Sequence, residues 1–253
     1  MNFFLLRGLI RERAHWGSFV GEMEKAFPGD RIITLEIPGV GDLYRETSPD
    51  NLDDMIESMR GSTEEYFAGG EENLLLAMSL GGMMARRWME RFPGDFRKVV
   101  LANTSFKGLS PLHHRLRPAT MLRFVRIFFT PGMEARESAI IRLVRNNTEN
   151  HEKILGEWVE IQARRPVSRK SFFNQIKAAL TFNPTLDRPE AHLLVLAGGG
   201  DRLCDPRCSR KIHETWGGTL AIHPTAGHDL PLDDPPWVID QIKGWLQGLR
   251  NAG

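Results

Sequence analysis

The chain has few cysteines, and this scarcity excludes several kinds of site. Only Cys204 and Cys208 occur among its 253 residues. Their C-x3-C spacing is not a redox C-x-x-C motif, and no further cysteine is present to complete a zinc quartet. Two free thiols are typical of a cytoplasmic protein, with a disulfide between them as the alternative. We therefore expect a cytoplasmic location.

The sequence also lacks the features of membrane, nucleic-acid and cofactor proteins. Its longest apolar stretches fall far short of the ~20 residues that span a bilayer, and its first residues have neither the basic region nor the apolar run of a signal peptide. A formal net charge of +1 gives no general attraction to nucleic acid. The histidines and carboxylates show no zinc spacing, and the glycines at 198–200 do not fit a dinucleotide or phosphate loop. We expect no transmembrane segment, nucleic-acid partner, metal or cofactor.

What the sequence does contain is an alternation of apolar and amphipathic segments, which predicts an α/β fold with a mostly parallel, doubly wound sheet. Strands are expected near residues 2–7, 31–37, 73–78, 97–103, 192–197 and 218–223. Helices are expected near residues 14–27, 50–68, 80–92, 206–216 and 235–250. The strand near 31–37 should lie at an edge of the sheet.

The segment Ala77-Met78-Ser79-Leu80-Gly81-Gly82 is the most informative stretch of the chain. It follows an apolar run and precedes a predicted helix, and it places small residues two before and two after a serine. This pattern is typical of the nucleophile elbow of serine hydrolases. Such a serine also lies at a helix N-terminus, where free N–H groups favour a developing negative charge. An ordinary helix N-cap is the alternative for this segment alone.

Two further polar side chains follow predicted strands. Asp201 comes after the run at 192–197 and three glycines, and His228 comes after the run at 219–222 and a glycine. The order Ser79, Asp201, His228 is the order of the alpha/beta-hydrolase triad and differs from the orders in chymotrypsin and subtilisin. Asp205 is an alternative acid, but the direct placement behind the strand favours Asp201.

At these residues the chain resembles the alpha/beta-hydrolase superfamily, along nearly its whole length. Residues 3–9 look like the strand and loop of the oxyanion hole, with Arg7 where the family usually has histidine, and residues 32–42 are similar to its Pro-Gly-x-Gly turn. The resemblance implies that the backbone N–H groups of Leu9 and Leu80 are the oxyanion donors. The family's N-terminal hairpin is missing, so we expect about six strands.

Residues 104–190 contain no convincing strand and are expected to form helices near 117–129, 133–146, 149–164 and 168–181. Their position and length match the helical cap that this superfamily inserts into its core. We therefore divide the chain into an alpha/beta-hydrolase core of residues 1–104 and 190–253 and a cap, or lid, of residues 105–189. A helical layer without a gating role is the alternative.

The cap has an uneven charge. Residues 107–182 contain fourteen Lys or Arg and six Glu, a net charge of +8, although the whole chain is at +1. Such a field would attract an anionic partner, such as a carboxylate-bearing ester, an acyl-coenzyme A or an acyl group on an acidic carrier protein. The alternative is that basic cap residues simply attract acidic core residues.

The sequence therefore predicts a cofactor-free serine hydrolase that cleaves a small-molecule carboxylic ester or thioester, with Ser79 as nucleophile, His228 as base and Asp201 as its orienting acid. A hydrolase of other acyl or carbon–carbon bonds would use the same triad. A non-catalytic ligand-binding protein on this scaffold is the alternative from another class. The natural substrate, the acyl length and the oligomeric state are left open.

Overall fold

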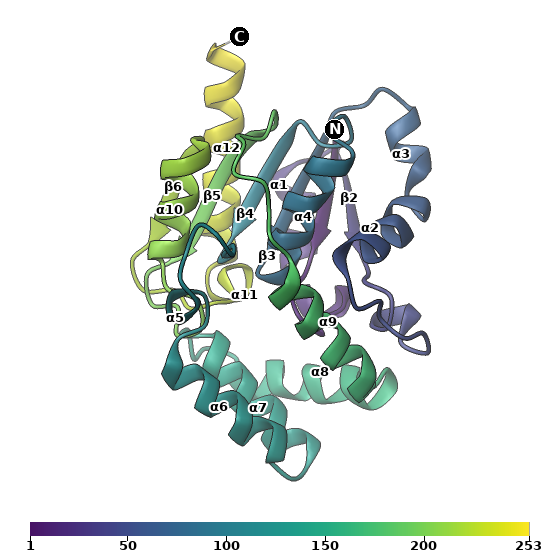
Figure 1. The fold of residues 1–253 in the computed structure, drawn as a ribbon, viewed down its shortest axis with the longest axis vertical. Coiled ribbons are helices and arrows are strands. Elements are labelled where there is room, and N and C mark those ends of the chain that lie inside the picture. The colour runs from purple at the N-terminus through teal and green to yellow at the C-terminus, as the bar shows by residue number, and fades with distance from the viewer. Residues whose placement is uncertain (253) are drawn as a thin grey trace.

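The computed structural model describes residues 1–252, and within them six strands form one parallel sheet (Figure 1). The spatial order is β2-β1-β3-β4-β5-β6. The strands are β1 (Asn2–Leu6), β2 (Arg31–Leu35), β3 (Asn73–Met78), β4 (Lys98–Ala102), β5 (His192–Gly198) and β6 (Thr219–His223). The predicted doubly wound α/β fold is confirmed, and the second strand does lie at an edge.

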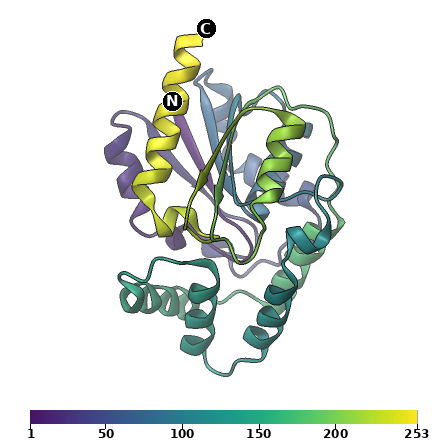
Figure 2. The same ribbon diagram turned by 90° about the vertical axis from the view of Figure 1, so that its left-hand side faces the viewer.

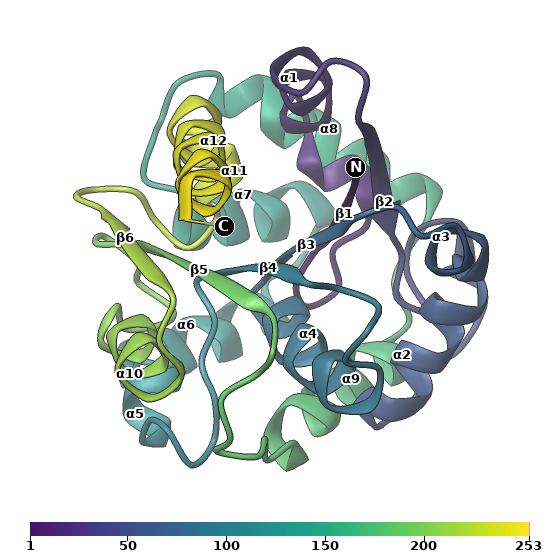
Figure 3. The same ribbon diagram turned by 90° about the horizontal axis from the view of Figure 1, so that it is seen from above.

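Helices cover both faces of this sheet (Figure 3). On one face lie α1 (Phe19–Ala26) and α12 (Pro235–Ala252), and on the other lie α2 (Leu52–Gly61), α3 (Glu64–Ala68), α4 (Leu80–Arg91) and α10 (Arg207–Trp216). The remaining helices are α5 (Leu112–Arg115), α6 (Pro118–Phe129), α7 (Met133–Val144), α8 (His151–Arg164), α9 (Arg169–Thr181) and α11 (Leu230–Asp233).

The two faces bury two apolar clusters because strand side chains alternate between them. Phe4 and Leu75 pack into the cluster under α2 and α4, whereas Phe3 and Leu74 pack into the cluster under α1 and α12. Central strands buried on both faces must be apolar throughout. This explains why all six residues of β3 are buried, and it gives the loops at the strand ends a rigid base.

Two predicted helices are each interrupted. The segment at 14–27 is a short 3-10 helix, Arg13–Trp16, followed by α1, because Gly17 adopts a φ of 55° between them. The segment at 50–68 is split into α2 and α3 around Thr63. Asn51 caps the start of α2, since its side chain accepts a hydrogen bond from the Asp54 amide at 2.9 Å.

The helices α6 to α9, between β4 and β5, lie together beyond one end of the sheet (Figures 1 and 2). Helices α7 and α8 share a small apolar cluster of their own around Trp158 and Ile141. This is the helical insertion expected from the sequence, whereas its boundaries at 105 and 189 stay a prediction. Among residues 1–252, no helix is both long and apolar enough to cross a membrane.

Candidate active site

Ser79 lies on a sharp turn between β3 and α4, with a φ of 55°. A non-glycine residue in this left-handed region is uncommon and marks a constrained backbone. The two glycines that follow are required by close contacts. A Cβ on Gly81 would lie 2.6 Å from the carbonyl oxygen of Arg7, and a Cβ on Gly82 would lie 2.6 Å from the Cβ of Thr104. These contacts leave no room for a side chain at positions 81 and 82.

The structure brings the three predicted residues together. His228 Nε2 lies 2.9 Å from Ser79 Oγ, and His228 Nδ1 lies 2.7 Å from Asp201 Oδ2. Asp201 Oδ1 accepts hydrogen bonds from the backbone N–H groups of Leu203 and Cys204, at 2.7 and 3.0 Å. The histidine and the aspartate are both buried. This arrangement can take a proton from Ser79 and hold the imidazole in one orientation.

The alternative acid, Asp205, lies in a different ion pair. Its carboxylate binds the Arg207 guanidinium at 2.9 Å. That hydrogen bond is the main cause that lowers the pKa of Asp205 to about 2. The structure therefore places Asp201 and not Asp205 against the imidazole.

Two opposing effects act on the His228 imidazole. Burial lowers its pKa, because desolvation disfavours the charged ring. The Asp201 carboxylate raises it through its charge and its hydrogen bond, and the net result is a pKa above the ordinary value of 6.5. A histidine of this kind is a stronger base than a free imidazole.

The loop after β1 lies against Ser79. A Cβ on Gly8 would be 2.9 Å from the Ser79 Cβ, so only glycine allows this approach. Leu9 and Leu80 both line the cavity next to Ser79, and among residues 1–252 neither backbone N–H donates a hydrogen bond to the protein. Free amides at this place can stabilise an oxyanion.

The next residue of this loop, Ile10, has a φ of 50°, which is strained for a β-branched side chain. Its backbone N–H donates a hydrogen bond to Gln175 Oε1 at 2.8 Å. Gln175 is fully buried in α9, and its Nε2 donates to Ser48 Oγ at 3.0 Å. A cap residue therefore holds the strained loop in place.

Arg7, where histidine was the usual family residue, is buried in an ion pair with Asp229. Arg7 Nη1 donates to Asp229 Oδ1 at 3.0 Å, and Arg7 Nη2 donates to Asp229 Oδ2 at 2.6 Å. The guanidinium also lies over the Trp16 ring, 4.8 Å from its centroid. Because Asp229 follows His228, this pair joins the loop after β1 to the loop that carries His228.

Asn103, at the end of β4, is a residue that the sequence analysis missed. Its Nδ2 donates to the carbonyl oxygens of Gly227 and His228 at 3.0 and 2.6 Å, and its Oδ1 accepts from the Gly198 amide at 2.7 Å. It therefore ties the loop of His228 to the strand that leads to Asp201. The sequence feature that could have identified Asn103 is a polar residue directly after a buried strand.

Ser79 and His228 open into a cavity of about 510 Å³ between the sheet and the cap. Its walls include apolar side chains from the cap, among them Phe124, Ile140 and Trp158. A volume of this size, mostly apolar with a few polar groups, suits a small-molecule ligand. The cap therefore covers the cavity into which Ser79 and His228 open.

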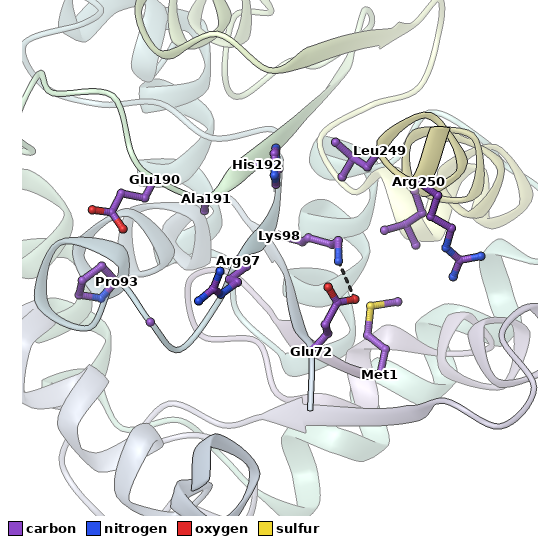
Figure 4. Close-up of a pocket in the computed structure, with 12 residues that line it drawn as sticks. Met1, Glu72, Pro93, Arg97, Lys98, Glu190, Ala191, His192, Leu249 and Arg250 are labelled. Carbon is purple, nitrogen blue, oxygen red and sulfur yellow. Dashed lines mark ion pairs between the residues drawn. The ribbon is translucent and has the colours of Figure 1, made fainter. Parts of the chain in front are cut away.

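A second cavity, of about 490 Å³, lies at the opposite end of the strands (Figure 4). It is lined by the residues that begin β4 and β5, and Lys98 forms an ion pair with Glu72 at 2.7 Å across it. None of the three predicted residues lines it. Within the described part of the chain, no group of three His, Cys, Asp or Glu side chains is placed to bind a metal ion.

Comparison with known proteins gives a family and several related folds. The model of the alpha/beta hydrolase family matches residues 3–241. No curated protein sequence matches the chain significantly.

Three solved structures illustrate the fold. A thermophilic esterase from Thermogutta terrifontis is 18% identical, with 98% of this chain and 90% of that chain covered and a TM-score of 0.73. The enol-lactonase from Burkholderia xenovorans is 17% identical, with 97% and 91% covered and a TM-score of 0.74. The 2-hydroxy-6-oxo-6-phenylhexa-2,4-dienoate hydrolase from Rhodococcus is 19% identical, with 96% and 90% covered and a TM-score of 0.73.

Proposed function

Because this chain belongs to the alpha/beta hydrolase family, we propose that it is a serine hydrolase that cleaves a carboxylic ester or thioester through an acyl-enzyme intermediate. Family membership supports hydrolysis in general. The observation that carries the finer proposal is the position of His228, within hydrogen-bonding distance of both Ser79 and Asp201 at the floor of a covered cavity.

In the first half of the reaction, Ser79 Oγ attacks the acyl carbon while its proton passes to His228 Nε2. Asp201 keeps the other ring nitrogen protonated and stabilises the imidazolium. The tetrahedral intermediate then collapses, and the leaving alcohol or thiol takes the proton from His228. In the second half, water attacks the acyl-enzyme with His228 again as base, and the carboxylic acid is released.

The negative charge on the tetrahedral oxygen needs donors that are already in place. We assign this role to the backbone N–H groups of Leu9 and Leu80. The close approach of Gly8 to Ser79 and the start of α4 at Leu80 support this assignment. Loss of one such donor costs about 100-fold to 1,000-fold in kcat in serine proteases.

Labelling with a fluorophosphonate probe tests the proposal, because the probe reacts with an activated serine. We expect the wild-type chain to be labelled and Ser79→Ala to be unlabelled. Ser105→Ala is a matched control in the neighbouring strand-end loop, because Ser105 also lines the cavity but forms no hydrogen bond with His228 among the residues that the structure describes. Equal labelling of wild type and Ser79→Ala would refute the assignment.

A panel of 4-nitrophenyl esters from acetate to decanoate then tests the bond class and the acyl length. A burst of 4-nitrophenol followed by slower turnover would support an acyl-enzyme. The solved relatives include a lactonase and a dienoate hydrolase, so lactones belong in the same panel. Tight ligand binding without turnover of any member would favour the non-catalytic alternative.

A cytoplasmic location also stays a proposal. It rests on the two cysteines, which are both buried and unlinked in the structure.

A further inference from the structure

The basic residues of the cap fall into distinct groups by their contacts. Of the fourteen Lys or Arg at 107–182, several are neutralised by carboxylates outside the cap. These pairs are Arg117 with Asp205, Arg145 with Asp233, Arg165 with Glu12 and Asp42, and Lys177 with Asp50. Attraction between cap and core therefore explains only part of the positive charge.

Three other arginines line the cavity and lie near no carboxylate. Arg115 comes from α5, Arg136 from α7 and Arg169 begins α9. Among residues 1–252, no carboxylate oxygen lies within 4.0 Å of a guanidinium nitrogen of these three arginines, which is the distance limit for an ion pair. Three separate elements thus each contribute to the wall of one cavity an arginine without a carboxylate partner, and the Arg169 guanidinium lies 5.9 Å from the centroid of the Phe128 ring in that wall.

The other charges in the cavity wall cancel. Arg7 pairs with Asp229, and Arg11 Nη2 lies 3.2 Å from Glu137 Oε2. The wall contains five arginines and these two carboxylates, which leaves three positive charges uncompensated. Arg136 and Arg169 are exposed to solvent, whereas Arg115 is half-buried, and a charge that is partly removed from water acts more strongly than one in open water.

Arg115 is the most constrained of the three. Its Nε is buried and has no hydrogen-bond acceptor among the described residues, and its Nη2 reaches only the Ala179 carbonyl oxygen at 3.3 Å. Burial lowers the pKa of this guanidinium, because desolvation penalises its charged form. A partly desolvated cation without a counter-charge is stabilised when an anion binds beside it.

We propose that Arg115, Arg136 and Arg169 recognise an anionic group that the substrate carries away from its scissile bond. The inference rests on the proposed function and narrows its substrate to an anionic ester or thioester. A carboxylate at the far end of the acyl chain supplies the required chemistry, and so do the phosphates of a coenzyme A thioester.

Paired substrates distinguish these two sources. Monomethyl esters of linear dicarboxylic acids are compared with methyl esters of monocarboxylic acids of equal length. Acyl-coenzyme A is compared with the neutral N-acetylcysteamine thioester of the same acyl group. The measured quantity is the ratio of kcat/KM for the anionic substrate to kcat/KM for the neutral one. We expect a ratio above one in at least one pair, and the pair identifies the anion.

Two matched sets of variants separate direct contact from a long-range field. Arg136→Gln/Arg169→Gln removes two charges from the cavity wall, whereas Arg123→Gln/Arg126→Gln removes two charges from α6 outside that wall. We expect Arg115→Gln to lower the ratio about tenfold, the first double variant to lower it by less because its arginines are more exposed, and the second to leave it unchanged.

Three results decide the outcome. A ratio of one in both wild-type pairs overturns the inference, although turnover of the neutral esters would still support the proposed function. An equal fall of the ratio in both double variants also overturns it, because a general field would then be the cause. Titration calorimetry on Ser79→Ala with the free dicarboxylic acid measures the affinity for the anion in the absence of catalysis. Binding that weakens in Ser79→Ala/Arg115→Gln supports the inference even where no ester is cleaved.

Discussion

The ion pair between Arg7 and Asp229 offers the sharpest test of how the site is held together. Both side chains are buried, each being 3% exposed, and two hydrogen bonds join them. Arg7→Met removes the positive partner and keeps much of the side-chain volume. The Asp229 carboxylate then stays buried without its counter-charge, next to the residue that we propose as the catalytic base.

The magnitude follows from this burial. Removal of one partner of a buried pair costs about 3–5 kcal/mol, whereas an exposed ion pair contributes about 0–1 kcal/mol. For a chain of about this size each kcal/mol lowers the melting temperature by about 2–4 °C. We therefore expect Arg7→Met to melt roughly 6–20 °C below the wild type. The double variant Arg7→Met/Asp229→Leu should recover most of this loss, because no buried charge is left unpaired.

Urea unfolding followed by tryptophan fluorescence, together with calorimetry, measures both variants. Arg31→Met is the control, because Arg31 is exposed and lies 3.9 Å from Glu71 at the sheet edge. We expect the control to change the free energy of unfolding by no more than about 0.5 kcal/mol. The reasoning is refuted if Arg7→Met lowers the free energy of unfolding no more than the control does. It is also refuted if the double variant loses as much stability as Arg7→Met and Asp229→Leu, each measured alone, lose together.

Three further predictions concern the geometry around Ser79. Asn103→Ala removes three hydrogen bonds from the loops of His228 and Asp201, and we expect kcat to fall about 10-fold to 100-fold with KM little changed; an unchanged kcat would contradict this role. Because the base must be neutral and the pKa of His228 is raised, kcat/KM should increase with pH through a limb above 6.5, and Asp201→Asn should move that limb to lower pH. A flat profile would argue against His228 as base. Gln175→Leu frees the Ile10 amide, and steady-state kinetics should show kcat about tenfold lower with the fold retained; equal kcat in variant and wild type would exclude Gln175 as a positioning residue.

The sheet and the three polar residues behind its strands could be predicted because each depends on local pattern. A parallel strand covered on both faces is a run of apolar residues, and β3 shows this with Leu74, Leu75 and Leu76. The carboxyl ends of such strands lie at one edge, so Ser79, Asp201 and His228 were expected at the same edge of the sheet. Their direct contact also needs the loop of His228 to reach back across β5 and β4 towards β3, which the strand order alone does not show.

The contacts that support these residues could not be predicted, because they join distant parts of the chain. Arg7 and Asp229 are 222 positions apart, and Ile10 and Gln175 are 165 positions apart. Nothing in the local pattern around Arg7 indicates its partner. The predicted helix at 14–27 was wrong at Gly17, because a φ of 55° there ends a helical turn that amphipathic spacing alone would continue.

The hydrogen bond between Ile10 and Gln175 shows that the cap also supports the loop after β1. A lid that only covers the cavity could be removed and leave the loop after β1 intact. Here the residue after Leu9 is strained, and the acceptor that satisfies its N–H belongs to α9. The same helix begins with Arg169, one of the arginines proposed to bind the substrate anion. The proposed recognition of the substrate and the position of the proposed oxyanion donors therefore both involve one helix, so a change in the packing of α9 should alter KM and kcat together.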